Sequence, residues 1–272
     1  MDNSVEESRQ VPVESERLRR LVDAGAGLVG RSAAGAASAA MSFLLAGPGG
    51  AALAGAAGAS LSLALRRIGV EITGRLLGPR EEARVGYVLV QGAAEILERM
   101  EQGETLREDG FFDARRPERS DAEEVAECVL LKSQREPEEQ KLPYMAHLLA
   151  NLAFDSSIGV QMAHQITKAA EQLTYRQLCV LKLAAVKERF GLRDTDYRGQ
   201  ESFSKQLYQV LYECVDLYNK SYINLGGEVA FGPTDVKPGS MVVQGLGVDI
   251  SNLMRLRNIP VKDIAPIAAM LK

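Results

Sequence analysis

The stretch from Ser32 to Leu65 constrains this chain most, because it carries no charged residue and consists mostly of Ala, Gly, Ser and Leu. Pro48 divides it into halves of about 15 residues, each shorter than the roughly 20 that cross a bilayer as a helix. Alanine and glycine also supply little apolar area for burial in lipid. A single helix that stably spans a membrane is therefore not expected. The glycines around Pro48 predict a helical hairpin that turns at Gly47–Gly50.

Small residues at four-residue spacing give the second arm of this hairpin a smooth face, and such faces let two helix backbones approach closely. A row of larger apolar residues runs beside the smooth face, and two arginines follow the uncharged stretch. The small residues are Gly50, Ala54, Gly58 and Ser62, the apolar row includes Leu53 and Leu61, and the arginines are Arg66 and Arg67.

Three interpretations of the hairpin remain open. It forms a tightly packed helix pair inside a soluble bundle, or it inserts into or lies on a membrane when copies assemble, or the stretch is a low-complexity linker. In the membrane interpretation, Arg66 and Arg67 would meet anionic lipid headgroups. A phosphate-binding loop is not expected, because no Gly-Lys-Ser/Thr follows the glycines.

Composition bounds the class of protein. With 46% hydrophobic residues and a net charge of −4, the chain is neither wholly disordered nor suited to coating nucleic acid. The cysteines are odd in number and widely spaced, at Cys128, Cys179 and Cys214, so we expect a reducing cytoplasm rather than a disulfide framework. Residues 1–20 are polar and acidic; we expect a flexible solvated tail, leading into a helix at Glu14–Leu21, and no signal peptide.

Helix signals divide the rest of the chain into three predicted parts after the tail. Pro79 precedes an amphipathic pattern that ends before Gly103, and the charged, aperiodic stretch Glu104–Arg119 is the expected domain boundary. Helix starts are predicted at Ser120 with Glu123, at Asp155 and Ser156, and at Thr174 with Gln177. The predicted parts are a small-residue hairpin plus amphipathic helix (21–103), a central helical bundle (120–191) and a C-terminal module (200–272).

Short motifs in the central part of the sequence resemble those of bacterial abortive-infection alpha-type (Abi-alpha) proteins. The resemblance rests on the run Tyr144–Asp155, read YMAHLLANLAFD, and on Glu171–Thr174, read EQLT at a helix start. A Gly/Ala-rich helical front precedes them, as in that family, and the likeness spans about Gly35 to Val186. It implies a prokaryotic phage-defence setting and brings no catalytic residue. The C-terminal third lies outside it.

The C-terminal part predicts a strong amphipathic helix from Phe203 to Tyr218. Glu228–Phe231 and Met241–Val243 are predicted to pair as a two-stranded hairpin, followed by helices at Asp249–Leu256 and Lys262–Leu271. We therefore expect an all-α, mainly helical bundle with a small β-hairpin in a winged-helix-like C-terminal module.

Tyrosines are concentrated on one flank of the Phe203–Tyr218 helix and in the residues after it. Lys205 is nearly the only basic residue of this helix, so few phosphates would be neutralised and nucleic acid is not the expected partner. Protein contact is expected instead, with the alternative that the tyrosines only cover the core. The candidate partner-binding residues are Tyr208, Tyr212, Tyr218 and Tyr222.

Candidates for chemistry are few. His147 and His164 fall on consecutive predicted helices and could face each other, but no close pair of metal ligands accompanies them, so no metal or cofactor is expected. The cysteines lack a context that would lower the thiol pKa, and no serine sits in a nucleophile elbow. The chain is therefore predicted not to be an enzyme.

These patterns favour a prokaryotic effector or scaffold that works without catalysis. In the leading hypothesis it serves anti-phage defence through self-association and membrane engagement of Ser32–Leu65. The alternative is a soluble cytoplasmic adaptor that binds a partner protein, or less favourably nucleic acid, through its C-terminal module. The expected location is the cytoplasm, with attachment to or insertion into the inner membrane on activation.

Overall fold

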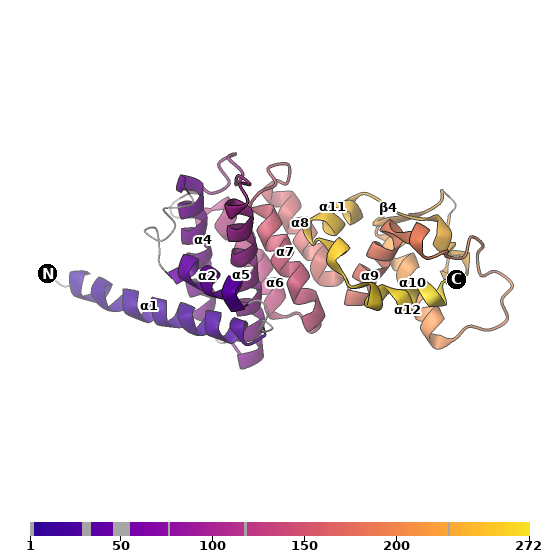
Figure 1. Cartoon of the computed structure of the whole chain (residues 1–272), viewed down its shortest axis with the longest axis horizontal. Helices are drawn as coiled ribbons and strands as arrows, with labels where there is room; N and C mark the ends of the chain where they lie inside the picture. Colours follow the sequence, from indigo (N-terminus) through magenta and orange to yellow (C-terminus); the bar gives the residue numbers. More distant parts are fainter. Residues whose placement is uncertain (1–2, 29–33, 46–54, 76, 117–118, 228) are drawn as a thin grey trace. The chain divides into compact units, whose positions relative to one another are not determined.

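The computed structural model describes residues 3–28, 34–45, 55–75, 77–116, 119–227 and 229–272 (Figure 1). The described chain is mostly helical, with short antiparallel strand pairs. It divides into two compact units, Met1–Glu171 and Gln172–Lys272. The division falls between residues 171 and 172 rather than at the predicted boundary, Glu104–Arg119, and it cuts through the predicted 120–191 bundle.

The first unit is built around α5 (Pro79–Glu101), which packs against several other described helices of that unit. Figure 1 shows α2 and α4 beside α5, and these neighbours come from both sides of the charged stretch Glu104–Arg119 in the sequence. This is the physical reason why that stretch is not a domain boundary. The neighbours are α1 (Asn3–Ala26), α2 (Ala34–Leu45), α4 (Gly55–Thr73), α6 (Asp121–Gln134) and α7 (Leu142–Leu152); α8 (Val160–Gln172) completes the series.

The N-terminal residues form a helix, not the predicted solvated tail. Helix α1 begins at Asn3, and Leu18, Leu21 and Val22 in its second half are completely buried. Residues at this spacing share one face of a helix, and that face packs against α5. Packing of this short apolar stripe against α5 stabilises the helix, although the other residues of α1 are mostly polar.

Local helix signals are confirmed at three of the four predicted starts. Pro79 is the first residue of α5. A capping box, in which Ser120 and Glu123 each bond the other's backbone amide, opens α6. The box of Thr174 with Gln177 opens α9 (Tyr175–Ala185). The prediction at Asp155 and Ser156 is wrong: α8 begins at Val160, and the Asp155 carboxylate accepts hydrogen bonds from the Ser157 amide and hydroxyl in a preceding turn.

In its described residues, the second unit combines four α-helices with one strand pair. After α9 come α10 (Lys205–Asn219), β3 (Ile223–Leu225), β4 (Met241–Val243), α11 (Leu246–Leu253) and α12 (Val261–Met270). The strands pair antiparallel, with Asn224 opposite Val242. Thus the predicted strand Met241–Val243 is confirmed, whereas its partner is Ile223–Leu225 rather than Glu228–Phe231.

Burial and turn chemistry explain this difference in pairing. Ile223 and Leu225 alternate with Asn224 and bury their side chains in the core of the second unit. The amide of Phe231 donates instead to the Asp235 carboxylate, 2.8 Å away, which holds that segment in a turn. Residues 229–231 therefore belong to the connection between the strands, and Glu228 lies outside the described residues.

A smaller strand pair lies in the first unit and was not predicted. β1 (Ala114–Arg116) pairs antiparallel with β2 (Arg119–Ser120), just before α6. The pair brings the end of the charged stretch back to the start of α6, where the Ala122 amide donates to the Phe111 carbonyl at 2.9 Å.

Candidate functional site

The Gly/Ala-rich segment is described only in part. Residues 34–45 form α2 and residues from 55 onward form α4, and these two helices pack against each other. The predicted turn Gly47–Gly50, together with Leu53 and Ala54, lies outside the described residues.

The described part of the small-residue stripe faces the interior of the first unit. Gly58 and Ser62 are buried, and the Ser62 hydroxyl donates to the Phe43 carbonyl of α2 at 2.8 Å. Leu61 and Leu65, from the neighbouring apolar row, are also buried. Within one copy of the chain, intramolecular contacts already bury the apolar surface of these residues.

The two arginines at the end of this stretch contact other helices of the same unit. Arg66 donates to the Ser15 hydroxyl over 3.4 Å, and Arg67 donates to the Glu123 carboxylate over 3.4 Å. The Arg67 side chain remains 54% exposed. Long contacts from an exposed side chain are weak, so Arg67 can exchange its partner at small cost.

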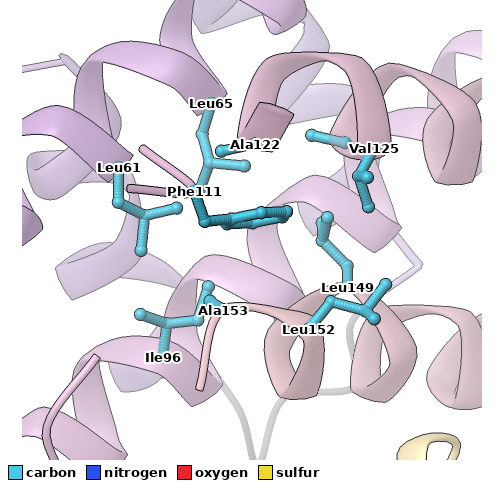
Figure 2. Close-up of a pocket in the computed structure, with 10 residues that line it drawn as sticks. Leu61, Leu65, Ile96, Phe111, Ala122, Val125, Leu149, Leu152 and Ala153 are labelled. Carbon is cyan, nitrogen blue, oxygen red and sulfur yellow. The ribbon is translucent and has the colours of Figure 1, made fainter. Parts of the chain in front are cut away.

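An apolar pocket surrounds Phe111, which points from the charged stretch into the space between α4, α5, α6 and α7 (Figure 2). Its volume of about 10 Å³ matches at most a single water molecule, and its lining is apolar. It therefore belongs to the core rather than to a ligand site. The lining residues are Leu61, Leu65, Ile96, Phe111, Ala122, Val125, Ala126, Leu149, Leu152 and Ala153.

Arg107 fastens Phe111 in this position. Its guanidinium lies 4.1 Å from the centre of the Phe111 ring and donates to the carbonyls of Leu152 and Ile158, at 3.3 and 2.9 Å. The same guanidinium holds the pKa of the Asp109 carboxyl below its usual range by hydrogen bonding. The sequence singled out the phenylalanines of this stretch but not the arginine that fixes them.

The four candidate tyrosines have different environments. Tyr208 and Tyr212 lie one turn apart on α10 and are 50% and 61% exposed. Tyr218 is half-buried, and Tyr222 is buried, which raises the pKa of its hydroxyl. The structure thus brings Tyr208 and Tyr212 together on one exposed face, while Tyr222 helps to cover the core.

Phe231, which the sequence pattern placed in a strand, is a further exposed aromatic residue of the second unit. Its side chain is 86% exposed, yet Asp235 holds the backbone amides of Phe231 and Gly232. A hydrogen bond from Arg198 at 2.7 Å, followed by that of the Phe231 amide, lowers the pKa of Asp235. The turn therefore fixes the backbone from which Phe231 projects.

The histidines do not face each other. His147 pairs with Glu95 of α5, and the His164 Nε2 atom lies 2.8 Å from a Glu124 carboxylate oxygen. In the part of the chain that the structure describes, no group of three His, Cys, Asp or Glu residues could hold a metal ion.

Two of the cysteine thiols, those of Cys128 and Cys214, have raised pKa values. Cys214 is fully buried, and burial raises its pKa to about 12. Burial also raises the pKa of the half-buried Cys128, although Lys132 nearby acts in the opposite direction. A protonated thiol is a poor nucleophile, so neither residue has the environment of a thiol catalyst.

Among the helices in the described ranges, none has both the length and the apolar character needed to cross a bilayer. No family model, curated protein or solved structure matches this chain. Its function is therefore inferred from the contacts and exposures above.

Proposed function

We propose that this protein is an adaptor without catalytic activity, whose second unit binds a partner protein through the exposed face of α10. The observation that carries the proposal is the exposure of Tyr208 and Tyr212, one helical turn apart. Tyrosine combines a large apolar ring with a hydroxyl that remains hydrogen-bonded to water or to a partner. It is enriched at the energetic centres of protein interfaces.

The packing of α10 makes this tyrosine pair a preorganised surface. Val210, Leu211 and Cys214 on the opposite face are completely buried, so the helix cannot rotate without exposing its core side. Arg176 of α9 also grips Glu213 through two hydrogen bonds of 2.8 Å. A rigid scaffold reduces the conformational entropy lost when a partner binds.

The charges of α10 favour a protein over a nucleic acid. Lys205 is the one basic residue within the helix, whereas Glu213 and Asp216 are acidic. Lys220, which caps the helix, pairs with Asp216. Such a surface would neutralise few phosphates.

The experiment compares three forms of the full chain as immobilised baits in an extract of the native host: wild type, Tyr208→Ser/Tyr212→Ser, and Gln206→Ala/Gln209→Ala. The glutamine variant is the matched control, because it changes two residues of the same helix without removing the aromatic pair. A partner captured by wild type and control is then purified and titrated. We expect at least tenfold weaker binding to the tyrosine variant, and equal affinity for all three forms would refute the proposal.

A second candidate function is self-association and membrane engagement through the Gly/Ala-rich stretch Ser32–Leu65, of which α2 is a described part. The observation that favours it is the exposed, uncharged face of α2, where Ser38, Ala39 and Ser42 point outward. Small residues on such a face allow close helix contact between copies. Together with the Abi-alpha resemblance, this supports a defence effector at the inner membrane.

The two arms of the hairpin give a discriminating pair of variants. Ala39→Leu changes an exposed residue, so it should leave the fold intact and weaken self-association, as followed by sedimentation and by flotation with anionic vesicles. Gly58→Leu changes a buried residue and should destabilise the first unit of an isolated copy. A wild-type chain that stays monomeric and never floats with vesicles would remove this candidate.

A further inference from the structure

A cleft of about 340 Å³ opens in the first unit between α4, the residues after Phe111 and the start of α6. This volume falls at the lower end of the range for small-molecule sites. The hydrogen bond from Ala122 to the Phe111 carbonyl ties two of its walls together. The cleft is lined by Ser60, Leu63, Ala64, Arg67, Phe112, Asp113, Ala114, Ser120 and Glu123.

Glu123 provides the buried hydrogen-bond acceptor of this cleft. Its side chain is only 5% exposed, and one carboxylate oxygen accepts from the Ser120 amide at 2.6 Å and from the Ser120 hydroxyl at 3.2 Å. The other oxygen, Oε1, has one partner within the described residues, the Arg67 guanidinium at 3.4 Å. A buried carboxylate oxygen normally has stronger hydrogen bonds than this single long contact. Glu123 lines the cleft, so the remaining acceptor capacity of its Oε1 atom is open to a ligand bound there.

The charges and the apolar wall define what would fit. Among the described lining residues, Glu123 and Asp113 are acidic and Arg67 is basic, which leaves one net negative charge. Arg67 is more than half exposed and can move aside. Phe112 and Leu63 offer apolar surface beside the carboxylates.

We propose that this cleft binds a small organic cation, an ammonium or guanidinium group carried on an apolar body. The cation replaces Arg67 as the partner of Glu123, and the apolar body lies against Phe112 and Leu63. The site is built entirely from the first unit, so it is independent of the tyrosine face on α10.

Three probes with one apolar body and different charges test the proposal: benzylamine, benzyl alcohol and benzoate. Each is titrated at neutral pH and low ionic strength into the full chain, and amide chemical shifts around Phe112, Ser120 and Glu123 are followed. We expect saturable shifts with benzylamine and at least tenfold weaker binding of the two other probes. Equal binding of all three, or binding of none, would overturn the proposal.

Two substitutions then test the role of charge at this site. Glu123→Gln keeps the capping function, because glutamine at this position can also accept from the Ser120 amide, but it removes the charge. We expect it to weaken benzylamine binding at least tenfold. Arg67→Gln removes the competing cation and should tighten benzylamine binding several-fold.

The two substitutions are expected to change the affinity for benzylamine in opposite directions. The Arg67→Gln variant therefore tests the proposal even if Glu123→Gln destabilises the start of α6. Arg67 is an exposed side chain, so Arg67→Gln should fold, as circular dichroism would verify. Preferential binding of benzoate that is lost in Arg67→Gln would show an anion site and refute the proposal. Weaker benzylamine binding by folded Arg67→Gln would refute it as well.

Discussion

Gly25 of α1 and Gly86 of α5 lie at a crossing where the two helix backbones touch. A Cβ atom added to Gly25 would lie 2.1 Å from the Gly86 carbonyl carbon, and one added to Gly86 would lie 2.0 Å from the Leu21 carbonyl oxygen. No real side chain tolerates such distances, so glycine is required at both positions. The crossing brings Leu21 of α1 into the core around α5.

We therefore predict that Gly86→Ala destabilises the first unit by about 3 kcal/mol, near the upper end of the usual cost of overpacking. The added methyl group meets backbone atoms, so α1 must move away from α5 as a whole. The measurement is hydrogen exchange of the amides in α1 and α5, with those of the second unit as an internal reference.

Gly69→Ala is the matched control for this substitution. A Cβ there would meet only the ends of flexible side chains, Leu18 Cδ1 at 2.7 Å and Leu89 Cδ2 at 3.2 Å. Alanine also favours the helix over glycine, so stability should stay within about 1 kcal/mol of wild type. If both variants lose the same protection, backbone contact is not what makes Gly86 necessary.

The sequence could predict features that depend on neighbours a few residues away. The boxes of Ser120 with Glu123 and of Thr174 with Gln177 each satisfy helix-end amides over three residues, so both were predicted correctly. The crossing of Gly25 with Gly86 joins distant parts of the chain. Nothing local distinguishes these two glycines from the others of a glycine-rich sequence.

The same distinction explains the errors in the second unit and at the N-terminus. Glu228–Phe231 has a strand-like pattern, but Ile223–Leu225 pairs with β4 because its side chains fill the core. Helix α1 depends on a few apolar residues that meet α5 only after folding. The exposed pair Tyr208 and Tyr212 could be nominated from helical spacing, whereas the burial of Tyr222 depends on tertiary packing.

Arg107 provides a second prediction. Arg107→Met keeps much of the side-chain volume but leaves the carbonyls of Leu152 and Ile158 without their donor, so we expect a loss of about 2–4 kcal/mol in the first unit. Thermal unfolding and hydrogen exchange around Phe111 would measure it. Arg75→Met removes an exposed ion-pair partner and should cost less than about 1 kcal/mol. Equal losses would mean that the Arg107 hydrogen bonds contribute little.

The turn that carries Phe231 should respond to acid at an unusually low pH. The pKa of Asp235 is lowered in the folded state, so its contribution to stability is complete above the usual aspartate range and is lost as pH falls through the lower folded value. The amide shifts of Phe231 and Gly232 should report this titration.

Removing Arg198 tests the cause of that shift. Arg198→Gln should move the titration of the Phe231 and Gly232 amides to higher pH, because the hydrogen bond from Arg198 is the largest influence on Asp235. Lys205→Gln removes a positive charge elsewhere in the same unit and should leave the titration in place. An unchanged midpoint in Arg198→Gln would contradict the assignment.

Alkylation of the cysteines by iodoacetamide gives the last prediction, because the reaction needs an exposed thiolate. At pH 8, a thiol with a pKa of about 12 is ionised on the order of one part in 10⁴, and Cys214 is also completely buried. Cys128 is half-buried and should react first, with a rate that rises about tenfold per pH unit between pH 7 and 8 because its pKa is raised.

Labelling of Cys214, followed by mass spectrometry in Cys128→Ser, should begin only when denaturant removes the amide protection of α10. Labelling of Cys214 in the native protein as fast as that of Cys128 would show that the core of the second unit opens readily.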